Sequence, residues 1–113
     1  MSPSDEQRVA DIVEAGENLA ALVADGRSAF DRDWMRQRAA ERLLEIIGEA
    51  SNALSEGFRS ERPAVDWRHI VNLRHLLAHH YHRIDLDQLW RIAAVEVPVM
   101  LEELHSPTDD TSD

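Results

Sequence analysis

The chain has 113 residues, of which 43% are hydrophobic and 30% charged, and its formal net charge is −10. These values are typical of one globular domain and argue against a broad basic surface as the means of holding nucleic acid. The sequence has no cysteine, which excludes disulfides and thiolate metal sites. No apolar run approaches the roughly 20 residues that span a bilayer. We therefore expect a cytoplasmic protein that does not enter the membrane.

All twelve basic residues are arginines. A compositional bias of the genome explains this most simply. Arginine also forms paired hydrogen bonds to phosphate that lysine does not form, so local contacts to phosphate stay open despite the acidic balance.

The first predicted helix covers about twenty residues from Ser4. Ser4 and Gln7 resemble a capping box, and Gly26 is a natural stop. Apolar residues recur at helical spacing between them, at Val9, Ile12, Val13, Leu19, Ala20 and Val23.

A short polar link through Asp31 and Asp33 leads to a longer second helix. Its apolar stripe runs from Ala40 to Phe58, and Gly57 lies near its end. Residues 59–66 predict a turn that follows this helix.

Asp66 and Asp85 are the predicted N-caps of a third and a fourth helix. The third runs from Trp67 to about His80, and Pro98 predicts a kink or break within the fourth. Residues 106–113 are predicted to form a disordered acidic tail behind a single domain, residues 1–105. The fold class is therefore all-α, an antiparallel bundle of four to five helices.

Five of the six histidines lie between His69 and His82, on the predicted third helix or directly after it. On a helix, most apolar residues from Trp67 to Tyr81 share one broad arc, and Arg74 falls inside that arc near one edge. A guanidinium among apolar side chains is costly unless it is paired, hydrated or functional. From spacing alone, a structural arginine whose head reaches solvent or a carboxylate is as good an explanation as a functional one.

Arg74 and His79 lie about 140° apart around a regular helix, so they do not face each other within one straight helix. Two arrangements bring them together. Either the helix loosens before His79, or the site assembles between two copies of the chain in a two-fold dimer.

His75, His79 and His82 share one helical face at metal-ligand spacing, and Asp85 can add a carboxylate. The simpler interpretation is a polar stripe that faces solvent and holds no metal. The pattern has neither a metal-binding motif nor a clear fourth ligand, so we expect no metal and no other cofactor.

The same segment resembles the HepT-like toxins of the HEPN superfamily. Their motif, arginine, four residues, histidine, one residue and tyrosine, reads here Arg74-His-Leu-Leu-Ala-His79-His80-Tyr81. Further blocks match in order from about residue 8 to 104: Asp11-Ile-Val-Glu-Ala15, Leu44-Glu-Ile-Ile-Gly-Glu-Ala50, Pro63-Ala-Val-Asp-Trp67, Ile84-Asp-Leu-Asp with Leu89-Trp90, and Val97-Pro98. The chain departs from the family pattern after the motif arginine, where His75 replaces a common asparagine, and in the additional His80 and His82.

The resemblance implies a homodimeric, metal-independent endoribonuclease that is the toxin of a type VII toxin–antitoxin system. Arg74 and His79 would be its catalytic pair, supported by His75 and His80. RNA would be the substrate, and a minimal nucleotidyltransferase would be the antitoxin, in a complex that can be larger than the toxin dimer. In some such pairs the antitoxin transfers AMP to the motif tyrosine, here Tyr81. The alternative function is a non-catalytic HEPN dimer that binds nucleotide or scaffolds the transferase.

Overall fold

The computed structural model describes residues 3–78 and 85–105, the side chains of Arg74 and Ala78 excepted. All the regular elements in this part of the chain are helices, and none is a β-strand, so the all-α prediction is confirmed. Its helical segments are α1 (Pro3–Val23), α2 (Arg27–Asp31), α3 (Trp34–Ala53), α4 (Glu56–Ser60), α5 (Trp67–Val71), α6 (Leu73–Ala78), α7 (Leu86–Arg91), the π-helix η1 (Ile92–Glu96) and α8 (Val97–His105).

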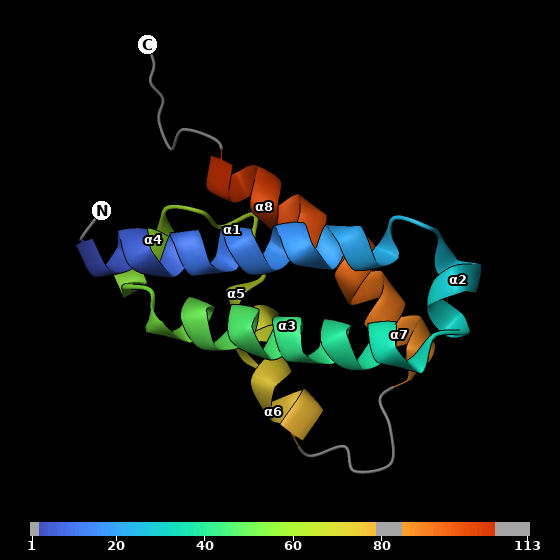
Figure 1. Cartoon of the computed structure of the whole chain (residues 1–113). Coiled ribbons are helices and arrows are strands. Elements are labelled where there is room, and N and C mark those ends of the chain that lie inside the picture. The colour runs from blue at the N-terminus through green and yellow to red at the C-terminus, as the bar shows by residue number, and fades with distance from the viewer. Residues whose placement is uncertain (1–2, 79–84, 106–113) are drawn as a thin grey trace.

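The two long helices α1 and α3 lie side by side and run in opposite directions (Figure 1). Most of the apolar residues expected from the sequence form their contact: Ile12 and Leu19 of α1, with Leu44 and Ile47 of α3, are fully buried. Ala20, which was expected on the same stripe, is exposed. Burial of each such side chain stabilises the fold by about 1.5–3 kcal/mol. This pair is the frame on which the shorter helices pack.

The helix α8 crosses close to α1 because Gly16 carries no side chain. A Cβ atom at Gly16 would lie 2.7 Å from Cδ1 of Leu101, which is closer than carbon atoms pack. From the α7–η1–α8 segment, Leu89, Ile92, Val97 and Met100 enter the same core.

The first predicted helix is present, but its predicted N-cap is wrong. α1 begins at Pro3, so Ser4 lies inside the first turn. Proline is favoured in that turn because its missing N–H would have no partner there in any case. Gly26 lies three residues after the end of α1 and directly before α2, and its φ of 93° is one that glycine adopts readily.

The second predicted helix is wrong in its length. α3 ends at Ala53, because Leu54 is extended and Ser55 caps a separate helix, α4, by accepting a hydrogen bond from Phe58 N. Ser55 itself is held by the buried Asp5 of α1, whose two carboxylate oxygens accept from Ser55 N at 2.8 Å and Ser55 Oγ at 2.7 Å. A contact across fifty residues therefore ends α3.

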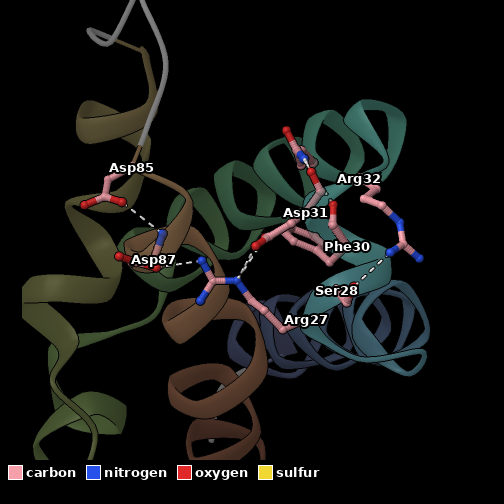
Figure 2. Close-up of polar contacts among 8 residues, drawn as sticks. Arg27, Ser28, Phe30, Asp31, Arg32, Asp85 and Asp87 are labelled. Atoms are coloured by element: carbon pink, nitrogen blue, oxygen red, sulfur yellow. Dashed lines mark hydrogen bonds and ion pairs between the residues drawn. The ribbon is translucent and has the colours of Figure 1, made fainter.

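The link before α3 contains the short helix α2, which the sequence did not predict. Figure 2 shows Arg27 of α2 between Asp31 and Asp87: its Nε donates to Asp31 at 2.9 Å and its Nη2 to Asp87 of α7 at 2.6 Å. The hydrogen bond to Asp87, followed by the one to Asp31, raises the pKa of Arg27 above its usual value. Behind this cluster, the ring of the buried Phe30 lies 5.5 Å from that of Trp90.

The third and fourth predicted helices are both interrupted. A turn at Asn72 divides the third into α5 and α6. The fourth begins after its predicted cap Asp85, which accepts from Asp87 N, and is divided by the π-helix η1. The predicted break at Pro98 is wrong, because the backbone stays helical through Val97 and Pro98; the irregularity is the π-helix η1, which ends just before Pro98. The predicted tail, residues 106–113, lies outside the described residues.

None of the helices in residues 3–78 and 85–105 combines the length and the hydropathy needed to cross a membrane.

Candidate functional site

The segment that contains the predicted site residues begins at the N-terminal end of α5, which two hydrogen bonds hold in place. Asp66 accepts a hydrogen bond from His69 N at 3.2 Å and caps α5, as predicted. The indole Nε1 of Trp67 donates to the carbonyl oxygen of Arg62 at 3.1 Å. These two contacts fix where α5 begins and therefore how α5 and α6 lie on α3.

The predicted apolar arc holds α5 and α6 against the core. Ile70 and Leu73 are buried, and Trp67, Leu76 and Leu77 pack against the core while partly exposed. The opposite side carries the polar side chains, including the exposed His75. The amphipathic pattern is thus confirmed for these residues.

Of the predicted site residues, His75 is the one whose side chain is described. Arg74 lies in the backbone of α6, and its side chain is not among the described ones. His79, His80, Tyr81 and His82 lie outside the described residues altogether, so their roles stay predictions. Since α6 is regular α-helix as far as Ala78, the described residues contain no loosening between Arg74 and that point.

His75 lines a groove of about 970 Å³ between the C-terminal half of α3 and the helices α4, α5 and α6. This volume is at the upper end of the roughly 300–1,000 Å³ of pockets for drug-sized ligands. The polar side chains of its lining are amide, imidazole, guanidinium and carboxylate groups, among them Glu49, Asn52, Arg59, Arg68, His69 and His75.

Two of the charged groups at this groove have structural tasks. Asp66, which also lines it, is the cap of α5. His69 Nε2 lies 2.9 Å from Oε1 of Glu96, whose other oxygen lies 3.4 Å from Nε of Arg91. This contact ties α5 to η1, so His69 helps to hold the wall of the groove in place.

Sequence reasoning singled out His75 but not Arg59, Arg68, Asn52 or His69 as site residues. Arg59 falls in what the sequence predicts as a turn, and Arg68 lies beside Trp67, upstream of the motif on which the chemical argument rests. The exclusive use of arginine was the one signal that pointed to phosphate contacts, and it does not say which arginines make them.

The metal-binding alternative stays a hypothesis, because two of its three histidines, His79 and His82, lie outside the described residues. Within residues 3–78 and 85–105, no three histidine, aspartate or glutamate side chains gather as metal ligands would.

Chemically, the groove combines guanidinium and amide groups, which can donate hydrogen bonds to an anion, with the imidazole groups of His69 and His75. The fold and the groove define a small all-helical domain with a polar, ligand-sized site. The chain belongs to the HepT-like ribonuclease family, because the family model described as "Ribonuclease HepT-like" matches residues 12–106. The family resemblance in the sequence is therefore confirmed.

Similar proteins carry ribonuclease names. "Putative RNase MJ1380" of Methanocaldococcus jannaschii is 37% identical over 95 residues, which cover 83% of this chain and 87% of that protein. "Probable ribonuclease HepT" of Thermococcus cleftensis is 32% identical over 99 residues, 87% of this chain and 90% of that protein. No solved structure is significantly similar to the chain.

Proposed function

We propose that this protein is a metal-independent endoribonuclease and the toxin of a toxin–antitoxin pair, with Arg74 and His79 as its catalytic residues. The observation that carries the proposal is the family match, which extends over the whole motif from Arg74 to Tyr81 and is joined by relatives named as RNases. The groove beside α6 supports it, because His75, the neighbour of Arg74, lines a polar site large enough for part of an RNA strand.

RNA cleavage without a metal needs a base, an acid and a cation. One His79 accepts the proton of a 2′-hydroxyl, whose oxygen forms a bond to phosphorus, and a second imidazole donates a proton to the 5′-oxygen as the bond from phosphorus to that oxygen breaks. With a reference pKa of about 6.5, histidine serves in both roles near neutral pH. Arg74 stabilises the charge on the phosphorane oxygens. The products are a 2′,3′-cyclic phosphate and a 5′-hydroxyl.

A homodimer supplies the second imidazole. The regular course of α6 up to Ala78 supports this arrangement, because a regular helix turns Arg74 and His79 about 140° apart. Two copies related by a two-fold axis place the arginine of one chain beside the histidine of the other.

A nucleotidyltransferase antitoxin would neutralise the enzyme by transferring AMP to Tyr81. The added phosphate group would compete with RNA for Arg74 and repel the RNA backbone. The acidic chain, with its net charge of −10, suits a basic docking face on such a partner.

The first test is RNA cleavage by the purified protein in excess EDTA. We expect wild-type cleavage with cyclic phosphate ends and a loss of about 10²–10⁴-fold in His79→Ala, the usual range for a lost acid–base group. His105→Ala is the matched control, because His105 is exposed on α8 and contacts the carbonyl oxygen of Leu101. Strict metal dependence with 5′-phosphate products would contradict the mechanism.

Tyr81 is tested by co-expression with a minimal nucleotidyltransferase antitoxin of a HepT-like pair. We expect the intact mass of the toxin to increase by whole AMP units and its cleavage activity to be lost. Tyr81→Phe should keep the activity and escape the modification. If the Phe variant were modified to the same extent as the wild type, Tyr81 would not be the residue that accepts AMP.

A further inference from the structure

The arginines of this protein fall into two groups. Ten have side chains in the described part, and eight of these have an ion-pair or hydrogen-bond partner there: Arg8, Arg27, Arg32, Arg36, Arg38, Arg42, Arg62 and Arg91. Within the same ranges, no partner is found for the side chains of Arg59 and Arg68. Both line the groove that His75 lines.

Arg59 is the more informative of the two because part of its guanidinium group is buried. Its Nε is shielded from solvent and has no acceptor within the described residues. Arg8, Arg36 and Arg62 also have one such nitrogen each, but their guanidinium groups are engaged elsewhere. A buried donor without an acceptor is unfavourable, so no contact within the described residues favours the present position of the guanidinium group over one turned toward a ligand in the groove.

The position of Arg59 is set by the core. Arg59 lies on α4, whose cap Ser55 is anchored to the buried Asp5 of α1. Arg68, which follows Trp67 in α5, lines the groove from that helix. Two consecutive short helices, α4 and α5, thus present guanidinium groups to one space.

We propose that Arg59 and Arg68 bind a non-scissile phosphate of a single-stranded RNA, a subsite next to the bond that Arg74 and His79 cleave. The inference rests on the proposed function and deepens it. Guanidinium groups match phosphate oxygens with paired hydrogen bonds. The indole of Trp67 in the same lining offers a surface for a base, and aromatic groups combined with basic ones are typical of single-strand binding.

The lining also explains why a strand, and not a free phosphate ion, is the expected ligand. Glu49 and Asp66 line the groove as well and offset the charge of the two arginines. A small anion gains little from a site with such a balance. A strand adds base contacts, and further phosphate contacts beyond the groove, to the same two guanidinium groups.

A non-scissile subsite contributes equally to the ground state and the transition state. Its loss therefore raises KM and leaves kcat nearly unchanged, whereas loss of Arg74 lowers kcat. We expect the double variant Arg59→Ala/Arg68→Ala to raise KM roughly tenfold or more. Arg32→Ala/Arg38→Ala is the matched control, because it also removes two positive charges, near the N-terminal end of α3 and away from the groove.

Binding is measured separately from cleavage with a 2′-O-methyl oligonucleotide, which lacks the attacking hydroxyl. The plot of log affinity against log salt should become shallower by about 0.7 for each phosphate of the single strand that the variant no longer neutralises. If Arg59→Ala/Arg68→Ala had the KM, affinity and salt slope of Arg32→Ala/Arg38→Ala, the subsite would be overturned. Competition by AMP as strong as that by the oligonucleotide would assign the groove to a mononucleotide and also overturn it.

Failure of the two proposals is distinguishable. If the wild type binds the oligonucleotide through Arg59 and Arg68 but cleaves no RNA, the two arginines form an RNA-binding site and the nuclease proposal falls. If the wild type cleaves RNA and the double variant does so with unchanged KM, the nuclease stands and the subsite falls.

Discussion

The two ends of α3 use arginine in opposite ways. At the N-terminal end, Arg27 and Arg36 are each paired with two carboxylates, Arg27 with Asp31 and Asp87, and Arg36 with Asp25 and Asp33. Towards the C-terminal end, Arg59 and Arg68 line a groove and have no partner among the described residues. Arginine side chains therefore join helices at one end of α3 and line a groove of ligand size at the other.

The difference shows that composition does not assign a task to a charged residue. An arginine beside acidic neighbours is occupied by the protein itself, and its role is to join helices, as Arg27 joins α2 to α7 (Figure 2). An arginine held at a groove without an acceptor is available to something outside the chain. Variants of the two regions should therefore differ in what they change, stability at one end and binding at the other.

The largest expected effect on stability is at the paired end, in the apolar contact beneath the arginine. Phe30→Ala should lower the free energy of unfolding by about 3–5 kcal/mol, because it empties a fully buried site against Trp90. Urea denaturation measures this. Trp34→Ala is the control, since Trp34 is 66% exposed and should change stability by no more than about 0.5 kcal/mol. Equal losses in the two variants would show that the α2–α7 end is not packed around Phe30.

The next effect connects stability to the groove. Asp5→Ala should lower the free energy of unfolding by about 2–3 kcal/mol, because it removes two charge-assisted hydrogen bonds to Ser55 and leaves a backbone N–H unpaired. Since Ser55 caps α4, the affinity for the 2′-O-methyl oligonucleotide should fall as well. Glu6→Ala removes a neighbouring exposed carboxylate and should do neither. If Asp5→Ala bound the oligonucleotide as tightly as the wild type, α4 would not be part of the binding site.

A smaller effect of opposite sign is expected in the core. Ser51 is fully buried, and its hydroxyl has no hydrogen-bond partner within the described residues. Ser51→Ala should therefore raise the free energy of unfolding by up to about 1 kcal/mol, measured as a higher thermal midpoint. Ser55→Ala, which removes the hydroxyl that caps α4 and donates to Asp5, should lower it by about 1–2 kcal/mol. A loss of stability in Ser51→Ala would mean that this hydroxyl has a partner.

The smallest effect concerns the arginines themselves. Arg27→Ala should lower the thermal midpoint at low salt, and the difference from the wild type should shrink as salt is raised, because exposed ion pairs are screened. Arg68→Ala should leave the thermal midpoint unchanged at both salt concentrations. A lower midpoint in Arg68→Ala would show that Arg68 is a structural residue and would weaken the distinction between the two ends.

Much of the fold follows from the sequence because its signals are local. Apolar residues at helical spacing predicted the buried faces of α1 and α3, and the aspartates Asp66 and Asp85 predicted two helix starts. Each of these signals acts over one or two helical turns, within reach of a sequence pattern. The motif around Arg74 and the family also follow from the order of residues alone.

Only the tertiary structure decided where the helices break and which arginines face the groove. α3 stops at Ala53 because Asp5, fifty residues away, holds Ser55, and Arg27 is occupied because Asp87 lies beside it across sixty residues. Helical periodicity continues through the first of these points and is silent about the second, since it records contacts between near neighbours in the chain. The sequence thus determined the helical class, much of the buried faces and the family motif. Contacts between distant residues, Asp5 with Ser55 and His69 with Glu96, hold the helices α4 and α5 from which Arg59 and Arg68 line one groove.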